Sequence, residues 1–210
     1  LQYPDRTREA VRNIRLTIAE GWKVALVGRV GSGKTTLLHA IPRLLDTPRG
    51  ALFLDGEDVN DLPLKALREN IGFATQETMI FSDTIRENVL FGRSGVAEEA
   101  LVETLKTVQF YEEVQEMEKG METLLGERGL TLSGGQRQRL CIARAILPQP
   151  PILILDDALS MVDTRTEERI LTRILESREG KTTLMVSHRV STIGRADLVV
   201  VLERGSVVET

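Results

Sequence analysis

The chain of 210 residues contains little cysteine, little net charge and no long apolar run. Cys141 is its single cysteine, so an internal disulfide and a cysteine-rich zinc site are both excluded, and a reducing compartment is expected. The formal charge of −4 argues against a general nucleic-acid binder, because such proteins neutralise phosphates with an excess of basic residues. The longest uncharged stretch, 145–155, contains three prolines and is far shorter than the roughly 18 apolar residues of a membrane-spanning helix. Residues 1–8 lack the apolar segment of a secretory signal.

The chain has the size and apolar content of one folded domain. About 150 residues per domain is typical, and a hydrophobic share of 41% is ordinary for a globular protein with a real core. The sequence contains no internal repeat and no low-complexity tract, which excludes solenoids and linkers. We therefore expect a single compact domain over 1–210.

Segments with strand character alternate with helical ones along the chain. Strands are expected at 14–18, 24–27, 51–54, 71–74, 152–155, 182–186 and 198–202, and helices at 35–45, 84–90, 97–108, 111–117, 133–147 and 164–175. Pro42 should kink or shorten the first helix, and Ser133 with Gln136 predicts a capping box at the start of the helix over 133–147. This alternation indicates a mainly parallel sheet covered by helices.

Residues 28–35 read Gly-Arg-Val-Gly-Ser-Gly-Lys-Thr and match the phosphate-loop pattern G-x-x-x-x-G-K-[ST]. The loop lies between a predicted strand and a predicted helix, which disfavours the alternative of a chance glycine-rich turn. Lys34 should reach the β- and γ-phosphates of a nucleotide, and the Thr35 hydroxyl should ligate Mg²⁺. The residues expected to contact the nucleotide are Gly28, Gly31, Ser32, Gly33, Lys34, Thr35 and Thr36.

Residues 151–157, Pro-Ile-Leu-Ile-Leu-Asp-Asp, predict a buried strand that ends in two carboxylates. Ligands of open α/β sheets lie at the carboxyl ends of strands, so Asp156 is placed to hold Mg²⁺ through water. Taken alone, such an aspartate is more often a helix cap or a turn residue. With a phosphate loop in the same chain, we predict the metal-binding role for Asp156.

Residues 132–136 read Leu-Ser-Gly-Gly-Gln and carry a resemblance to a known family. With its motifs in the family's order, nearly the whole chain resembles the nucleotide-binding domain of an ATP-binding-cassette (ABC) transporter. The resemblance implies that Tyr3 stacks on adenine, that Gln76 senses the metal and the attacking water, and that His188 contacts the γ-phosphate. Taken alone, Tyr3 could be an edge-strand aromatic, Gln76 any polar loop residue and His188 a structural histidine.

The resemblance also implies a partner domain. In the family, two such domains pack head to tail and bury two ATP molecules, each held between one phosphate loop and the opposite signature segment. The resemblance therefore assigns the signature residues to the partner's nucleotide; these are Ser133, Gly134, Gly135 and Gln136. It also places Asp163, the last residue of the D-loop (160–163), among the nucleotide contacts.

Two further stretches resemble the exporters of this family. Residues 80–88 resemble the Q-loop extension and residues 123–129 the short X-loop, on which helices of the membrane domain dock. The resemblance implies a transmembrane domain earlier on the same polypeptide, so we expect a domain excised from a longer chain, with its first strand partly missing. It also implies a location at the cytoplasmic face of the cell membrane, without insertion into the membrane.

At Asp157 the chain departs from the family, which usually has glutamate there as the general base toward the attacking water. A general base must lie within about 2.6–3.2 Å of the group that it deprotonates, so the shorter side chain should lose most of a roughly 10²–10⁴-fold contribution. We expect the chain's own site to bind ATP well and to hydrolyse it slowly. This pattern resembles the degenerate half of a heterodimeric exporter with an unlike partner; a homodimer with relaxed geometry at Asp157 is the alternative.

Together these features predict an α/β fold with a P-loop NTPase core, RecA-like and with a mainly parallel sheet. We expect a small antiparallel β subdomain and a helical subdomain over roughly 81–147. The predicted activity is that of an ATPase that requires ATP and Mg²⁺ and couples ATP binding and hydrolysis to substrate export. The alternatives are a soluble ABC ATPase that acts on DNA or ribosomes, and a regulatory module that binds ATP without turnover. We expect no nucleic-acid partner.

Overall fold

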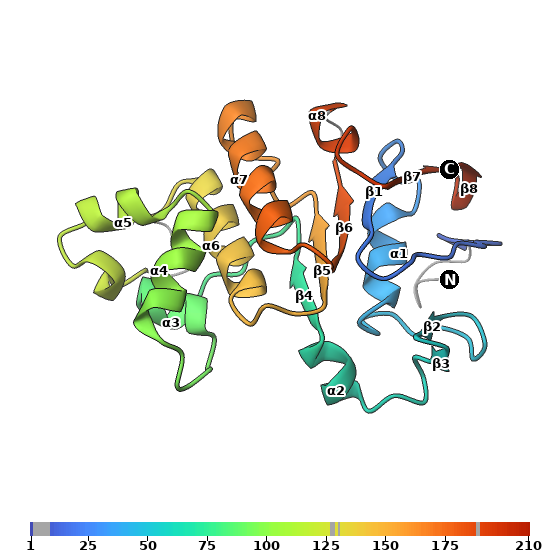
Figure 1. Ribbon diagram of the computed structural model, residues 1–210, viewed down its shortest axis with the longest axis horizontal. Coiled ribbons are helices and arrows are strands. Elements are labelled where there is room, and N and C mark those ends of the chain that lie inside the picture. The colour runs from blue at the N-terminus through green and yellow to red at the C-terminus, as the bar shows by residue number, and fades with distance from the viewer. Residues whose placement is uncertain (2–8, 127–128, 130, 188–189) are drawn as a thin grey trace. The chain divides into compact units, whose positions relative to one another are not determined.

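A computed structural model describes residues 1, 9–126, 129, 131–187 and 190–210 (Figure 1). The chain divides into two compact units. The first unit comprises Leu1–Gly72, Pro150–Asp156 and Gly180–Thr210, and the second unit comprises Phe73–Gln149 and Asp157–Glu179. Among the described residues, no helix combines the length and the apolar character that a membrane crossing requires.

A six-stranded sheet has the order β4-β5-β6-β1-β7-β8 (Figure 1). Its strands are β1 (Lys23–Val27), β4 (Ile71–Ala74), β5 (Ile152–Asp156), β6 (Thr182–Val186), β7 (Leu198–Glu203) and β8 (Ser206–Glu209). β1 pairs in parallel with β6 and β7, β5 pairs in parallel with β6, and β8 is antiparallel to β7. Val24, Ala25 and Leu26 in β1 are fully buried, as expected for a central parallel strand. The mainly parallel sheet confirms the predicted α/β class.

The described residues of the first unit also form short helices and a small antiparallel sheet. The helices are α1 (Lys34–Ala40), α2 (Leu64–Glu69) and α8 (Val190–Ile193). β2 (Phe53–Leu54) pairs antiparallel with β3 (Glu57–Asp58), which confirms the predicted antiparallel β portion. α1 ends before Pro42, because a proline ring clashes with the carbonyl one turn earlier in a helix. The predicted shortening of this helix is therefore confirmed, whereas α2 was not predicted.

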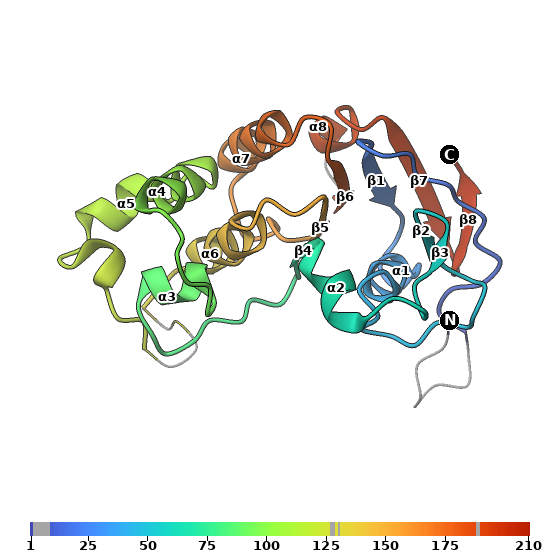
Figure 2. The same cartoon turned by 60° about the horizontal axis from the view of Figure 1, so that its bottom comes forward.

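The second unit is built from helices around an apolar core. These helices are α3 (Ile85–Leu90), α4 (Glu98–Thr107), α5 (Tyr111–Glu116), the 3₁₀ turn η1 (Gly120–Glu122), α6 (Gly134–Ile146) and α7 (Thr164–Ser177). α3 packs against α6, and α4 lies beside α6 and α7 (Figure 2). Phe110, Leu105 and Leu140 are among the fully buried side chains of this unit. The helices predicted in this part of the chain are all present, with ends that differ by one or two residues.

The strand predicted over 14–18 is wrong, since the structure assigns no strand to these residues. The alternation itself is present, because Ile14, Leu16 and Ile18 are half-buried and the residues between them are exposed. A strand also requires a neighbouring backbone that accepts and donates its hydrogen bonds. The burial pattern therefore identifies the inward-facing side chains but does not establish that such a neighbour exists.

Candidate functional site

The loop from Gly28 to Gly33 joins β1 to α1 and passes very close to other backbone at its two ends. A Cβ atom on Gly28 would lie 2.3 Å from the carbonyl oxygen of Leu202 in β7. A Cβ atom on Gly33 would lie 2.7 Å from the carbonyl oxygen of Ala10, and Gly33 also has a φ of +106°. Neither position accepts a larger residue without displacement of the backbone. The two glycines therefore allow the loop to pack directly on its neighbours.

Lys34 directs its ammonium group back onto the loop. Its Nζ donates hydrogen bonds to the carbonyl oxygens of Gly28, at 2.7 Å, and Arg29, at 3.1 Å, and the residue is only 8% exposed. The positive charge is thus held where an anion cradled by the loop's N–H groups would meet it. The Ser32 hydroxyl is buried in the same loop and has no hydrogen-bond partner among the described residues. A bound ligand or water would satisfy this hydroxyl.

Thr35 and Asp156 meet in the folded chain although 121 residues separate them. The Thr35 hydroxyl, on α1, donates to Asp156 Oδ1 at the carboxyl end of β5 over 3.2 Å. Asp156 is 2% exposed. A hydroxyl and a carboxylate suit Mg²⁺, which prefers oxygen ligands and retains several waters. The structure therefore brings together two of the three residues predicted to bind the metal.

The third of these residues, Gln76, contacts the predicted general base. Gln76 Nε2 donates to Asp157 Oδ2 over 3.2 Å, and both residues belong to the second unit. Asp157 has a φ of +50°, a left-handed conformation that costs a residue with a side chain about 1 kcal/mol. Such strain is common at functional sites, where the surrounding contacts hold it.

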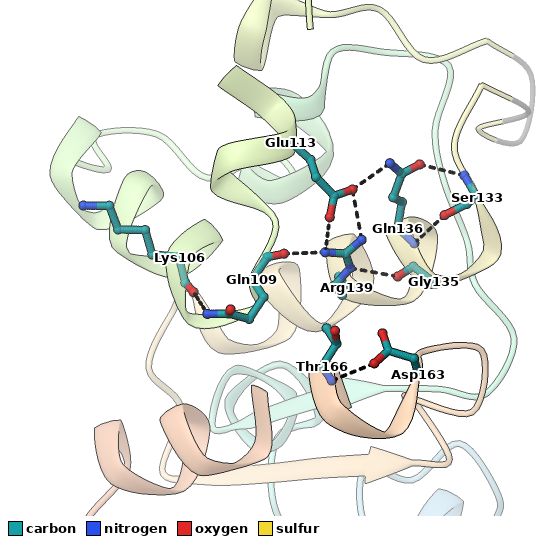
Figure 3. Close-up of polar contacts among 9 residues, drawn as sticks. All are labelled: Lys106, Gln109, Glu113, Ser133, Gly135, Gln136, Arg139, Asp163 and Thr166. Atoms are coloured by element: carbon teal, nitrogen blue, oxygen red, sulfur yellow. Dashed lines mark hydrogen bonds and ion pairs between the residues drawn. The ribbon is translucent and has the colours of Figure 1, made fainter. Parts of the chain in front are cut away.

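The signature residues form the first turn of α6, where they close a complete capping box (Figure 3). Ser133 Oγ accepts a hydrogen bond from the Gln136 backbone N–H over 3.2 Å, and the Ser133 N–H donates to Gln136 Oε1 over 2.8 Å. The capping box predicted from this spacing is therefore confirmed. Ser133 itself remains exposed at the end of the helix.

The side chain of Gln136 is held from α5 (Figure 3). Its Nε2 donates to Glu113 Oε2 over 2.8 Å, and Arg139 donates to both oxygens of Glu113, at 2.6 and 3.1 Å. Burial raises the pKa of Glu113, but the hydrogen bonds from Arg139 and Gln136 outweigh this effect, so that its pKa is lowered. Glu113 is thus an ionised acceptor for two residues of the signature helix.

The D-loop, 160–163, packs on the same helix through Gln138. Gln138 is 1% exposed; its Nε2 donates to Ser160 Oγ over 2.9 Å, and its Oε1 accepts from the Met161 N–H over 2.7 Å. The Met161 side chain lies over Gly134, since a Cβ atom on that glycine would be 2.6 Å from the Met161 sulfur. The signature glycine is therefore covered by a flexible side chain of the D-loop.

Four further residues were predicted to belong to the site, and the structure describes only Asp163 and Thr36 among them. Asp163 caps α7 by accepting from the Thr166 N–H over 3.0 Å, and hydrogen bonds from the Thr166 side chain and backbone lower its pKa. Thr36 is buried in α1. Tyr3 and His188 lie outside the described residues, so the roles assigned to them stay predictions.

A family model described as ABC transporter matches residues 11–160. This match covers well over half of the chain and includes the phosphate loop, Asp156 and the signature segment. The chain belongs to the ABC transporter family. Domains of this family bind ATP, usually together with Mg²⁺.

Relatives of this ABC-family chain are considerably longer. The ATP-dependent lipid A-core flippase of Syntrophus aciditrophicus is 44% identical over 95% of the chain and 33% of the relative. A putative multidrug export ATP-binding/permease protein of Staphylococcus aureus is 43% identical over 100% of the chain and 36% of the relative. A bacterial Atm1-family ABC exporter solved with ATP bound has a TM-score of 0.93 and 36% identity, over 99% of this chain and 36% of that chain. The chain thus spans about a third of the length of these relatives.

Sequence reasoning missed three side chains around the ABC signature, namely Glu113, Gln138 and Arg139. The sequence does predict that Arg139 faces inward. It follows Gln136 by three residues and precedes the buried Ala143 by four, so it lies on the inward face of the helix. A charged residue on such a face requires a partner. The identity of that partner depends on tertiary packing, which periodicity does not predict.

Proposed function

We propose that this chain binds MgATP at its phosphate loop and supplies the ATPase activity of an exporter. The observation that carries the proposal is the meeting of Thr35 and Asp156 next to a loop that holds the Lys34 ammonium inside it. Lys34 would contact the β- and γ-phosphates, and the loop's N–H groups would cradle the phosphate oxygens. Mg²⁺ on Thr35 and, through water, on Asp156 would neutralise phosphate charge during hydrolysis.

The proposal includes a second nucleotide-binding domain. The exposed Ser133 hydroxyl and the Gly135 N–H would contact ATP that is held by the opposite domain's phosphate loop. Two domains packed head to tail would then complete each other's sites, so that dimerisation follows ATP binding. The similarity to an Atm1-family exporter solved with ATP bound supports the ATP-binding part of this proposal.

We infer that the whole protein exports a substrate and that this chain is its ATP-binding domain at the cytoplasmic face of a membrane. The relatives named as a flippase and as a multidrug export permease support this inference, because a permease requires a membrane-embedded part. The chain would be one nucleotide-binding domain over 1–210, in which the helices of the second unit form the helical subdomain.

We also propose that the chain's own site is slow. Asp157 is one methylene shorter than the glutamate of the family motif, and its carboxylate accepts a hydrogen bond from Gln76. A base out of reach of the attacking water loses most of its catalytic effect while ATP binding is retained. The signature residues are intact, so an unlike partner with a glutamate at this position could use them, and the competent assembly would be a heterodimer.

Parallel assays of MgATP binding and of steady-state hydrolysis test both parts of the proposal. Lys34→Ala should weaken MgATP binding about 100-fold, because it removes charge-assisted hydrogen bonds to phosphate. Lys65→Ala, which alters an exposed lysine on α2, is the matched control and should leave binding unchanged. Asp157→Glu should leave binding unchanged and raise kcat about 100-fold, more strongly at higher protein concentration.

Each part can fail separately. Unchanged MgATP binding by Lys34→Ala would refute the nucleotide-binding role. Equal and substantial turnover of the wild type and of Asp157→Glu would refute the slow site. Slow turnover of both, with intact MgATP binding, would indicate that the required partner domain is absent from the assay.

A further inference from the structure

The Ser133 hydroxyl stands at the end of a chain of hydrogen bonds that starts at Arg139 on α6 and passes through Glu113 on α5 (Figure 3). Arg139 donates two hydrogen bonds to Glu113, Glu113 accepts one from the Gln136 side chain, and that side chain accepts the Ser133 N–H. The Gln136 backbone N–H in turn donates to the Ser133 hydroxyl. Each hydrogen bond between α5 and the signature turn thus has a defined donor and a defined acceptor.

The Arg139 side chain, at the start of this network, is held in place by several contacts. Its side chain is 10% exposed, its Nη1 also donates to the Gln109 carbonyl oxygen, and its guanidinium lies 5.2 Å from the centre of the Phe110 ring. A guanidinium held by backbone, ring and carboxylate together has little rotational freedom. Glu113 is therefore located by a side chain that is itself immobilised.

The chemistry of Glu113 decides which end of the Gln136 amide faces Ser133. An ionised carboxylate has acceptors only, so it binds the NH₂ group of an amide and leaves the amide oxygen on the opposite side. That oxygen is the atom that accepts the Ser133 N–H. An uncharged neighbour with both donors and acceptors would permit the amide to rotate by half a turn, and the capping box would then lose one of its two hydrogen bonds.

We propose that Glu113 is a positioning residue for the signature segment: through Gln136, it orients the Ser133 hydroxyl toward the ATP of the opposite domain. This inference rests on the proposed head-to-tail function and deepens it. It gives Gln136 a positioning role rather than a direct contact with nucleotide, because both ends of its amide are engaged within the chain. Removal of the carboxylate should therefore impair the opposite phosphate loop and spare the chain's own.

The test uses the full-length protein with its partner domain and disables one phosphate loop at a time. With Lys34→Ala in this chain, the opposite loop alone is active, and it depends on this chain's signature. Glu113→Gln should then lower the ATPase rate about tenfold, the effect of one lost charge-assisted hydrogen bond. When the opposite domain's loop lysine is replaced instead, in an Asp157→Glu background that restores the chain's own site, Glu113→Gln should change the rate less than twofold.

Matched variants separate positioning from general damage. Glu112→Gln removes the same charge from an exposed residue of the same helix and should have no effect in either arrangement. Arg139→Lys keeps the positive charge but loses the paired hydrogen bonds, so it should reproduce the asymmetry of Glu113→Gln. An equal loss of rate in both arrangements, or no loss in either, would overturn the proposal.

Ser133→Ala, tested in the same two arrangements, distinguishes the inference from the function on which it rests. If Ser133→Ala acts only on the opposite loop and Glu113→Gln does not, the positioning role is wrong and the head-to-tail function stands. If Ser133→Ala shows no such asymmetry, the proposed function itself fails. Thermal unfolding of each variant shows whether a rate has fallen because less protein is folded.

Discussion

The phosphate loop and the signature segment are both glycine-rich turns that lead into a helix, but the first turns of the two helices differ in side-chain capping. α1 begins after Gly33, and the described residues provide no side-chain cap for it. α6 begins after Ser133, whose capping box with Gln136 is complete. Among the described residues the first helix thus has no side-chain cap, while the second is capped by its own side chains. The signature turn is therefore held by its own residues, whereas the phosphate-loop turn is the one that we propose to receive an anion.

The glycines of the two turns differ in the same way. A side chain at Gly28 would strike the backbone of a central strand, whereas a side chain at Gly134 would strike the flexible end of Met161. Backbone within a sheet yields only at the cost of its hydrogen bonds, while an exposed methionine can adopt another rotamer. Only glycine therefore fits at Gly28 without displacement of the backbone. At Gly134 a larger residue fits if the Met161 side chain moves away.

The largest effect is expected from alanine in the phosphate loop. Gly28→Ala places Cβ 2.3 Å from the Leu202 oxygen and should lower the free energy of unfolding by about 3 kcal/mol, with loss of MgATP binding. Gly31→Ala is the matched control, because no described atom lies within 4 Å of its Cβ and only its φ of +79° is unfavourable. It should cost about 1 kcal/mol. Urea unfolding measures both, and equal losses would contradict the role of close packing.

A smaller effect of the opposite sign is expected in the signature turn. Gly134→Ala in a Met161→Ala background should raise the free energy of unfolding by about 0.5 kcal/mol, because alanine is favoured over glycine in a helix and the sulfur is gone. In the wild-type background the displaced Met161 should cancel this gain. Urea unfolding of the two single variants and the double variant measures the coupling. Strictly additive effects would show that Met161 does not restrain this glycine.

The sequence predicts the local parts of both turns, since their patterns are complete within a few residues. The phosphate loop and the capping box each depend on a fixed spacing, and the pairing of Thr35 with Asp156 follows because strand ends meet at one edge of a sheet. The contact between Glu113 and Arg139 has no such pattern, because it depends on how α5 packs near α6. The error over 14–18 has the same origin, since a strand depends on a neighbour that its own residues do not specify.

The smallest effect is the pH dependence of the signature network. The pKa of Glu113 lies below its ordinary value of 4.5 in the folded chain, so its ionised form stabilises the fold. That contribution is fully present above the unfolded pKa and is lost as the pH falls through the folded pKa. Glu113→Gln lacks the contribution at every pH.

The difference in Tm between wild type and Glu113→Gln should therefore be greatest at neutral pH and should shrink below about pH 4.5. The other carboxylates of the chain titrate in both proteins and cancel in this difference. Glu112→Gln, at an exposed residue of the same helix, is the matched control for the removal of one negative charge. A Tm difference that stayed constant from pH 7 to pH 3.5 would mean that the carboxylate of Glu113 is not the group that holds Gln136.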